Sequence, residues 1–339
     1  MEESPLKLYL GIDIGSVSTN LVLINSQGEL VKKIYLRSKG NPVASVQKGL
    51  ALLIKDIKDF EIAAVGTTGS GRQLIAKLLG ADLVKNEITA HAIACLNLEP
   101  EVQTIIEIGG QDSKLILIRD GIVKDFAMNT VCAAGTGSFL DQQAARLNID
   151  IKDFGERAVE GEHPVRIAGR CAVFAESDMI HKQQMGHPLE DILAGLCRAL
   201  VRNYLGNLGK GRELKPPIIF QGGVAANLGI RKAFEETLEC RLIIPEHYEV
   251  MGAIGAALLA KDAVINQKAV TRFKGFQVID NPIITESFDC SGCSNQCEVV
   301  ELKQEGLLIA CLGDKCGKWS GRIPDRFLEP SRARAIQAG

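Results

Sequence analysis

The sequence predicts an α/β protein built from a duplicated subdomain and followed by a small cysteine-rich segment. Strand and helix patterns alternate up to about residue 262, and a strand–turn–strand pattern recurs after 94 residues. Five of the ten cysteines fall between Cys290 and Cys316. We therefore expect two domains, residues 1–265 and residues 266–339, which agrees with a length of 339 residues.

The first copy begins with short apolar runs that are separated by tight turns. Alternation of apolar and polar residues predicts strands, and the spacing of Val46, Leu50, Leu53 and Ile57 predicts a helix. The expected elements are strands at 7–13, 21–25, 30–36 and 61–65, a helix over 43–57, and a glycine-rich turn from Gly66 to Arg72.

The recurring pattern is an acid followed by Ile-Gly at the end of a strand. Asp13-Ile14-Gly15 followed by Leu21 to Ile24 returns as Glu107-Ile108-Gly109 followed by Leu115 to Ile118, at the same offset in both pieces. Two copies indicate two related subdomains with a cleft between them. The alternative is chance, because Ile-Gly and Leu-Ile are common pairs.

Composition excludes several classes of protein. Lys plus Arg is 39 and Asp plus Glu is 41, so the formal charge is −2, which argues against a nucleic-acid binder. No apolar run reaches the roughly 18 residues of a membrane span. The N-terminus shows no export signal, so we expect a cytoplasmic protein whose cysteines are buried, reactive or metal-bound rather than in disulfides.

The acid–glycine turns have the residue types of a phosphate site. Glycine allows close approach of backbone N–H groups, and hydroxyl or amide side chains beside it add donors. An acid beside a phosphate implies Mg²⁺ between them, and Gln111 is placed to orient a water near the γ-phosphate. The candidates are Asp13, Gly15, Ser16, Ser18 and Thr19 in the first copy, Glu107, Gly109, Gly110, Gln111, Asp112 and Ser113 in the second, and Gly222, Gly223 and Asn227 near the nucleoside. The alternative reading is three ordinary tight turns.

Two cysteines stand where helices are expected to begin. Cys132 precedes a predicted helix at about 138–147, and Cys171 opens another helical stretch. A helix N-terminus favours a thiolate or an anionic cluster. An iron–sulfur cube needs four ligands, and a symmetric dimer with two cysteines per chain supplies four. The alternative is two buried thiols, which is also what we expect of Cys95, Cys197 and Cys240.

The chain resembles the ATP-dependent activators of 2-hydroxyacyl-CoA dehydratases and the ATPase subunits of benzoyl-CoA reductases. The resemblance covers about residues 7 to 262. Its motifs are GIDIGSVSTN, VGTTGSGR, IEIGGQDSK, MNTVCAAGTGSFLD, GRCAVFAESDMI, FQGGVAAN and PEHYEVMGAIGAAL, in the family's order. Asn20 stands where the family frequently has a lysine, and Glu107 stands where it has an aspartate.

The resemblance implies an actin-, hexokinase- and heat-shock-chaperone-like ATPase fold with two subdomains around an ATP cleft. It implies catalytic roles for Asp13, Glu107 and Gln111, phosphate contacts as far as Lys114, and bound Mg²⁺. It also implies a homodimer that holds one [4Fe–4S] cluster between its subunits through Cys132 and Cys171 of each chain.

The implied activity is ATP-driven electron transfer. ATP binding and hydrolysis change the angle between the cluster-bearing helices, and one electron passes from ferredoxin or flavodoxin to a low-potential iron–sulfur enzyme. A 2-hydroxyacyl-CoA dehydratase, an aryl-CoA reductase or a related double-cluster reductase would each fit as the acceptor. The alternatives are a small-molecule kinase of the same superfamily and a nucleotide-dependent scaffold with a zinc module.

The C-terminal segment has the cysteine spacing of a metal site. Cys290, Cys293 and Cys297 form one group, and Cys316 is the expected fourth ligand beyond a hairpin at about 298–309. We expect Cys311 to be the spare thiol, because it lies in an apolar run. Tetrahedral Zn²⁺ or a second iron–sulfur cluster fits this set, and so does a purely structural site.

Overall fold

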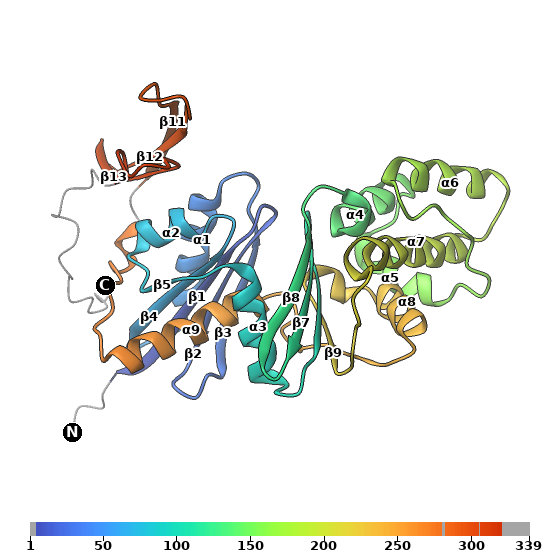
Figure 1. Cartoon of the computed structure of the whole chain (residues 1–339), viewed down its shortest axis with the longest axis horizontal. Coiled ribbons are helices and arrows are strands. Elements are labelled where there is room, and N and C mark those ends of the chain that lie inside the picture. The colour runs from blue at the N-terminus through green and yellow to red at the C-terminus, as the bar shows by residue number, and fades with distance from the viewer. Residues whose placement is uncertain (1–4, 280–281, 305, 321–339) are drawn as a thin grey trace. The chain divides into compact units, whose positions relative to one another are not determined.

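A computed structural model describes residues 5–279, 282–304 and 306–320 of the chain (Figure 1). The chain divides into two compact units. The first unit takes the described residues up to Ala90 and from Gly252 onward, and the second runs from His91 to Met251. Each unit is built around its own five-stranded sheet.

The first sheet has the strand order β3-β2-β1-β4-β5. Its strands are β1 (Leu6–Ile14), β2 (Ser18–Ile24), β3 (Leu30–Arg37), β4 (Phe60–Gly69) and β5 (Leu83–Val84). β1, β2 and β3 are antiparallel neighbours, and β4 and β5 add parallel strands on the other side of β1. The helices along this part of the chain are α1 (Pro42–Ile54), α2 (Arg72–Leu79) and α3 (Glu87–Leu98).

The second sheet repeats the first. Its order is β10-β9-β6-β7-β8, so β6 takes the place of β1, β7 of β2, β8 of β3, β9 of β4 and β10 of β5. The strands are β6 (Thr104–Ile108), β7 (Ser113–Arg119), β8 (Ile122–Asn129), β9 (Ile218–Gln221) and β10 (Leu242–Ile243). Strand directions match as well. The duplication predicted from the recurring acid–Ile-Gly pattern is therefore confirmed.

The two copies differ in what joins their third and fourth strands. Between β3 and β4 the chain forms only α1, whereas between β8 and β9 it forms a long helical insertion. The insertion consists of η1 (Ala133–Gly135), α4 (Gly137–Arg146), α5 (Ile151–Val159), α6 (Ala172–Gln184), α7 (Leu189–Tyr204) and the π-helical turn η2 (Leu205–Gly209). Both Cys132 and Cys171 lie in this insertion.

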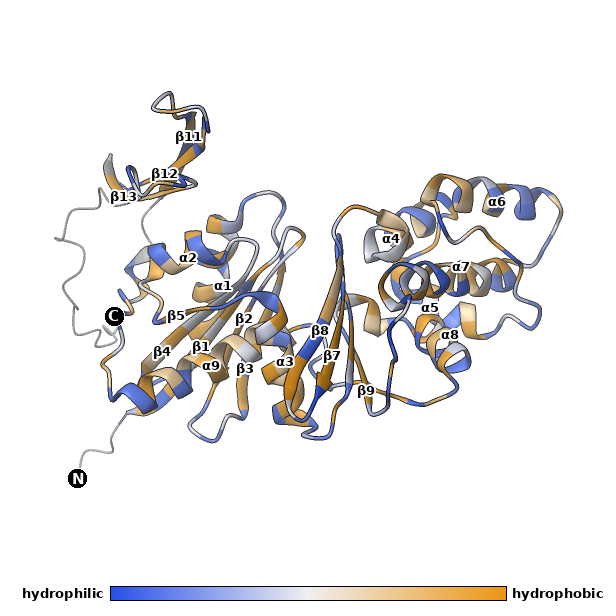
Figure 2. Ribbon diagram, viewed as in Figure 1, coloured by the Kyte–Doolittle hydropathy of each residue, from blue (hydrophilic) through white to orange (hydrophobic). Residues whose placement is uncertain are grey.

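Each unit has an apolar core, and Figure 2 shows apolar residues, in orange, on both the strands and the helices. The second core also takes residues from α7 and from α8 (Leu228–Leu238), which follows the short turn η3 (Gly223–Ala226). In the first unit, α9 (Met251–Gln267) lies directly on the sheet. A Cβ at Gly11 would meet the carbonyl of Ala253, and one at Gly66 would meet the carbonyl of Ala256. Glycine at these positions is what allows the close approach.

The structure corrects one expected turn. The segment from Gly66 to Arg72 was expected to turn, but β4 continues to Gly69, and only Ser70 and Gly71 separate it from α2. Gly66 pairs with Gly11 of β1, and the pairing continues to Gly69. The glycine at 66 therefore serves packing against α9 rather than a turn.

The C-terminal segment forms a three-stranded antiparallel sheet, β11 (Ile283–Asp289), β12 (Glu298–Gln304) and β13 (Leu307–Leu312). The predicted hairpin is thus present, with a third strand beside it. Leu302, Ile309 and Ala310 join the core of the first unit, and the Lys77 ammonium donates to the Cys311 carbonyl at 2.9 Å. Among the described helices, which include η4 (Phe276–Ile279), none combines the length and apolarity that a membrane crossing requires.

Candidate functional site

The turn between β1 and β2 is closed by its own glycine. The Gly15 N–H donates to the Ser18 carbonyl at 2.9 Å, which leaves Ser16 exposed at the tip. Thr19 is buried, and its hydroxyl lies 2.9 Å from that of Ser38. Three hydroxyls were expected to face a phosphate. The structure places Ser16 and Ser18 at the turn, whereas the Thr19 hydroxyl lies below the turn and is hydrogen-bonded to Ser38.

The turn between β6 and β7 repeats this geometry. The Gly109 N–H donates to the Asp112 carbonyl at 3.0 Å, and Gln111 is exposed at the tip. Beneath it, the buried Lys114 ammonium lies 2.9 Å from Glu107 and 2.9 Å from Asp112. Burial alone would lower the pKa of Lys114, but the two carboxylates hold this pKa above its usual value.

The two acids thus have different neighbours. Glu107 pairs across the strands with Lys114, whereas Asp13 pairs with Asn20 at the equivalent place. A lysine neutralises a carboxylate, and a carboxamide does not. The departure noted in the sequence, asparagine for lysine at position 20, therefore places an uncharged side chain opposite Asp13, where the second turn has an ammonium opposite Glu107.

A glycine in the left-handed region stands beside each acid. Gly69 ends β4 and Gly222 follows β9, and both have φ of +88°. A Cβ at Gly69 would contact the Ile14 carbonyl and lie 2.6 Å from Asp13 Oδ1. A Cβ at Gly222 would contact the Ile108 carbonyl and lie 2.8 Å from Glu107 Oε1. Gly222 was expected in a site, but the matching role of Gly69 was missed, because the insertion after β8 breaks the constant offset between the copies.

Two buried hydroxyls beside these strands have no hydrogen-bond partner within the described part of the chain. They belong to Thr68, which is opposite Asp13 in the β1–β4 pairing, and to Ser113, which begins β7. Buried polar groups are normally satisfied by a partner, and a bound ligand is one source of it. The turns therefore fit a polar ligand with its cation. Thr68 did not stand out from the sequence alone.

The third expected segment, Gly222 to Asn227, is held mainly by its own backbone. The Gly222 N–H donates to the Tyr248 carbonyl at 2.9 Å, and η3 begins at Gly223. Asn227 caps α8, because its Oδ1 accepts the Ile230 N–H at 3.0 Å. The segment is held by these hydrogen bonds and has a glycine that allows close approach, which suits the face of a nucleoside.

The second turn is hydrogen-bonded to the start of α4. The Gly137 N–H donates to the Gly109 carbonyl at 2.9 Å, and the Ser138 N–H donates to the Gly110 carbonyl at 2.8 Å. The Ser138 hydroxyl also donates to the Gly110 carbonyl. The turn expected to hold a phosphate is therefore bonded directly to the segment that follows Cys132.

Cys132 and Cys171 both stand at helix starts, as expected, and both are half-buried. Cys171 is the N-cap of α6, whereas Cys132 caps the short turn η1 that precedes α4. Asn129 fixes the Cys132 backbone from both sides. Its Oδ1 accepts the Cys132 N–H at 2.9 Å, and its Nδ2 donates to the Cys132 carbonyl at 2.8 Å.

One amide joins the two cysteine segments. Asn203 on α7 is buried, and its Nδ2 donates to the Gly169 carbonyl at 2.6 Å and lies 4.0 Å from Cys132 Sγ. Asn207 in turn donates to Asn203 Oδ1 at 3.1 Å. Sequence reasoning missed Asn203, because it lies far from both cysteines along the chain and in no glycine-rich motif.

Large apolar side chains next to both cysteines face solvent. Val131 is 95% exposed, and Val173 and Phe174 at the start of α6 are also exposed. Apolar groups around a pair of half-buried thiols are typical of a surface that is covered by another protein. Two thiols per chain with N–H groups nearby fit half of the ligand set of a [4Fe–4S] cluster.

The C-terminal cysteines are not gathered into one ligand set. Across residues 5–279, 282–304 and 306–320, no group of three or more His, Cys, Asp or Glu side chains is arranged to hold a metal ion. Cys290 and Cys311 are buried in a cluster that Cys297 packs against, whereas Cys293 and Cys316 are exposed. The Trp319 indole donates to Cys290 Sγ at 3.2 Å, and this bond, with one from the Gly292 N–H, lowers the pKa of Cys290.

The buried interior of the second unit holds two further thiols and a histidine. Cys95 and Cys197 are fully buried, as expected of packing residues, and burial raises the pKa of both. Cys240 is partly buried against the same core. His91 Nδ1 lies 2.9 Å from the Gln221 amide nitrogen, and burial together with the charge of Lys114 lowers the pKa of His91 to about 3.

Comparison with known proteins identifies the family. The model of the BadF/BadG/BcrA/BcrD ATPase family matches residues 10–260. The chain is 34% identical over 253 residues to the (R)-2-hydroxyglutaryl-CoA dehydratase activating ATPase of Acidaminococcus fermentans, covering 74% of this chain and 96% of the relative. It is 33% identical over 265 residues to the 2-hydroxyisocaproyl-CoA dehydratase activator of Clostridioides difficile, covering 77% and 98%.

Solved structures agree with these relatives. Component A of the Acidaminococcus fermentans dehydratase superposes with a TM-score of 0.71 at 31% identity and covers 76% of this chain and 99% of its own. The Clostridium difficile activator with bound ADPNP gives a TM-score of 0.71 at 32% identity, with 78% and 98% covered. The expected ATPase fold with two related subdomains is confirmed, and the chain belongs to the BadF/BadG/BcrA/BcrD ATPase family.

Proposed function

We propose that this protein uses ATP hydrolysis to deliver single electrons to an iron–sulfur enzyme of the acyl-CoA dehydratase or aryl-CoA reductase type. Reduced ferredoxin or flavodoxin supplies each electron, and the partner enzyme is reduced by it, while ATP is converted to ADP and phosphate. Support comes from relatives named as dehydratase activators and from one feature of the second unit, the bonds between the turn at Gly109–Gly110 and the start of α4.

The two acid–glycine turns are the proposed phosphate sites. Ser16 and Ser18 in the first turn, and Gly110 and Gln111 in the second, present groups at the turn surface. Asp13 is the better candidate to hold Mg²⁺, because Asn20 takes the place that Lys114 has beside Glu107. Glu107 and Lys114 then serve as a neutral buried pair that fixes the second turn.

The proposed coupling runs from the second turn to the cysteines. A shift of Gly109 and Gly110 that accompanies loss of the γ-phosphate moves α4, because Gly137 and Ser138 are bonded to their carbonyls. A ligand shifts a conformational equilibrium only if it binds the two states differently. Because the turn is bonded to α4, the position of the turn that contacts the γ-phosphate also sets the position of α4. Asn203 extends the link from Cys132 to the segment before Cys171.

Cys132 and Cys171 of two chains are the proposed ligands of one [4Fe–4S] cluster in a homodimer. The cluster, when bound, would supply one-electron transfer at a potential set by its surroundings. The chain's own part is to present two half-buried thiols at helix starts and to surround them with apolar side chains that a second copy covers. We keep as a separate prediction that Cys290, Cys293, Cys297 and Cys316 bind Zn²⁺ or a second cluster, which requires Cys293 and Cys316 to move inward.

The decisive experiment is anaerobic purification with iron, zinc and subunit analysis. We expect a brown dimer with about four irons per two chains, beyond any metal of the C-terminal segment. Cys132→Ala should lose the four shared irons and Cys316→Ala should keep them, whereas Cys316→Ala should lose the zinc or the additional iron of the C-terminal segment. A colourless monomer after reconstitution, with both cysteines open to alkylation, would disprove the proposal.

A second experiment tests the coupling itself. Ser138→Ala removes one of the bonds to the Gly110 carbonyl, so it should retain nucleotide binding and iron while transferring fewer electrons per ATP. Ser177→Ala is the matched control, because among the described residues its hydroxyl bonds only to the Val173 carbonyl in the same helix, at 3.1 Å. ATP consumption that rises with a sugar or carboxylate, independently of reductant, would instead indicate a kinase.

A further inference from the structure

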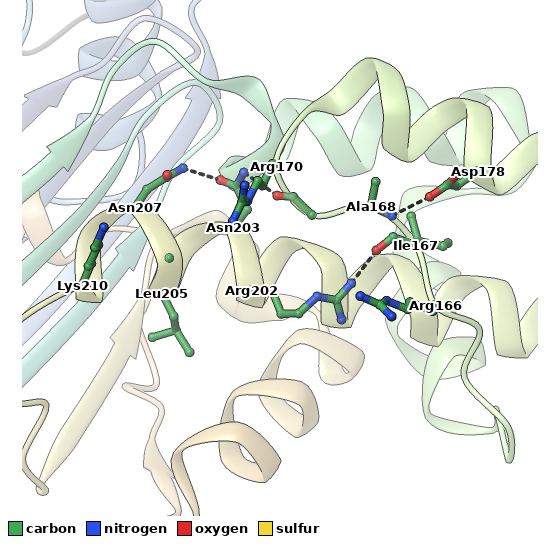
Figure 3. Close-up of a pocket in the computed structure, with 12 residues that line it drawn as sticks. Arg166, Ile167, Ala168, Arg170, Asp178, Arg202, Asn203, Leu205, Asn207 and Lys210 are labelled. Carbon is green, nitrogen blue, oxygen red and sulfur yellow. Dashed lines mark hydrogen bonds between the residues drawn. The ribbon is translucent and has the colours of Figure 1, made fainter.

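A basic basin lies beside the segment that leads to Cys171. It has a volume of about 950 Å³ and is lined by the stretch from Arg166 to Arg170 and by the end of α7 with η2 (Figure 3). Its charged side chains are Arg166, Arg170, Arg202, Lys210 and Asp178. The basin lies wholly within the second unit.

The charges of the basin are not balanced. Asp178 is the one carboxylate in its lining, and its Oδ2 already accepts the Ala168 N–H at 2.8 Å. Within the part of the chain that the structure describes, Arg166, Arg170 and Lys210 form no ion pair, and the Arg202 guanidinium donates to the Ile167 carbonyl. Four cations thus line the basin together with one carboxylate that already accepts a hydrogen bond, in a chain whose net charge is −2.

The neighbouring guanidinium groups repel one another, which disfavours their charged forms. Burial, and then the charges of Arg166 and Arg198, lower the pKa of Arg202. Like charges held together are relieved when an anion lies between them. Guanidinium groups bind phosphate and carboxylate oxygens through paired N–H donors, and three of them around a hollow select an anion with several oxygens.

We propose that this basin binds a compact multivalent oxyanion, of the polyphosphate or polycarboxylate type. The cavity shape favours a small ligand over a flat acidic protein surface, because the cations line a hollow rather than a ridge. Gly169 and Asn203 form one wall, and they are bonded to each other at 2.6 Å. The ligand therefore lies against the same two residues that join the cysteine segments.

The test is calorimetric titration of the full chain with pyrophosphate and with citrate, after the nucleotide site has been filled with ADP. We expect at least one of them to bind, with an affinity that falls steeply between low and high salt. Arg166→Gln/Arg170→Gln should weaken binding by roughly tenfold or more, since each guanidinium provides charge-assisted bonds. The substituted side chains form no ion pair among the described residues, so the thermal midpoint should be unchanged.

Arg198→Gln is the matched control. Arg198 lies on the same helix as Arg202 but pairs with Glu236 at 2.9 Å outside the basin, so this variant should bind within about twofold of the unaltered protein. The proposal is overturned if neither anion binds, or if the double variant binds as tightly as Arg198→Gln. Binding of polyglutamate but of neither small anion would overturn it too, in favour of an acidic protein partner. None of these outcomes depends on iron or on electron transfer.

Discussion

Replacing Lys114 with methionine should destabilise the second unit strongly at neutral pH. The side chains of Lys114 and Glu107 are 5% and 7% exposed and lie 2.9 Å apart, whereas Asp112 is 36% exposed. In Lys114→Met the carboxylate of Asp112 can be hydrated, but Glu107 keeps a buried charge without its cation. Removing one member of a buried pair typically costs about 3–5 kcal/mol.

Protonation of Glu107 sets an upper limit on this cost. A carboxyl with an ordinary pKa of about 4.3 takes up a proton at pH 7 for about 3.7 kcal/mol, and at pH 5 for about 1 kcal/mol. We therefore expect Lys114→Met to lower the free energy of unfolding by about 3 to 3.7 kcal/mol at pH 7 and by about 1 kcal/mol at pH 5. Glu107→Gln/Lys114→Met should recover most of the loss at pH 7, because no charge remains buried.

Urea denaturation followed by circular dichroism at both pH values measures these differences. Lys215→Met is the matched control, because its pair with Glu213 spans 3.1 Å between side chains that are 43% and 75% exposed. An exposed pair of this kind contributes at most about 1 kcal/mol. A loss below 1 kcal/mol for Lys114→Met at pH 7, or an equal loss at both pH values, would refute the reasoning.

Three further variants test other parts of the structure. The pKa of His91 falls from 6.5 unfolded to about 3 folded, so the unfolded chain binds the extra proton and stability is lost as pH falls from 6.5 towards 3. Between pH 7.5 and 5.5 this loss is about 1.4 kcal/mol, and His91→Gln should remove that share of the pH dependence in denaturation curves. Gly222→Ala should lower the free energy of unfolding by roughly 2 kcal/mol more than Gly121→Ala does. Both glycines have positive φ, but of the two only Gly222 has backbone atoms within 4 Å of the new Cβ. Equal shifts in the thermal midpoint would contradict this. Asn203→Ala should lower the free energy of unfolding by about 1–3 kcal/mol, and it should release iron to a chelator faster than the unaltered protein. An unchanged rate of release would show that Asn203 does not position the cysteines.

The duplicated core could be predicted from the sequence, because the repeat is local and ungapped. Asp13-Ile14-Gly15 and Glu107-Ile108-Gly109 each end a strand, and the same offset relates the hydrogen bonds that close both turns. The match between Gly69 and Gly222 could not be found in this way. The inserted helices separate the two glycines by a different interval, and only the strand pairing shows that they are equivalent.

Contacts between distant segments also escaped prediction. The positions of Cys132 and Cys171 at helix starts follow from local sequence, but the link through Asn203 depends on how α7 packs. In the C-terminal segment, spacing alone grouped Cys290 with Cys316. In the structure Cys311 lies in β13 and is buried with Cys290, which directly follows β11, whereas Cys316 lies beyond the end of β13 and is exposed.

The bonds between the Gly109 and Gly110 carbonyls and α4 limit which substitutions can test the coupling between the turn and the helix. The acceptors are main-chain carbonyls, and two of the three donors are main-chain amides. Side-chain substitution therefore deletes only the contribution of the Ser138 hydroxyl, and proline, which lacks the N–H, would also constrain the backbone at the start of the helix. Separating the remainder requires an edit of the peptide bond itself. An ester in place of the amide at Gly137 removes one donor and keeps every side chain, so semisynthesis can measure the contribution of a single main-chain bond between the turn and the helix.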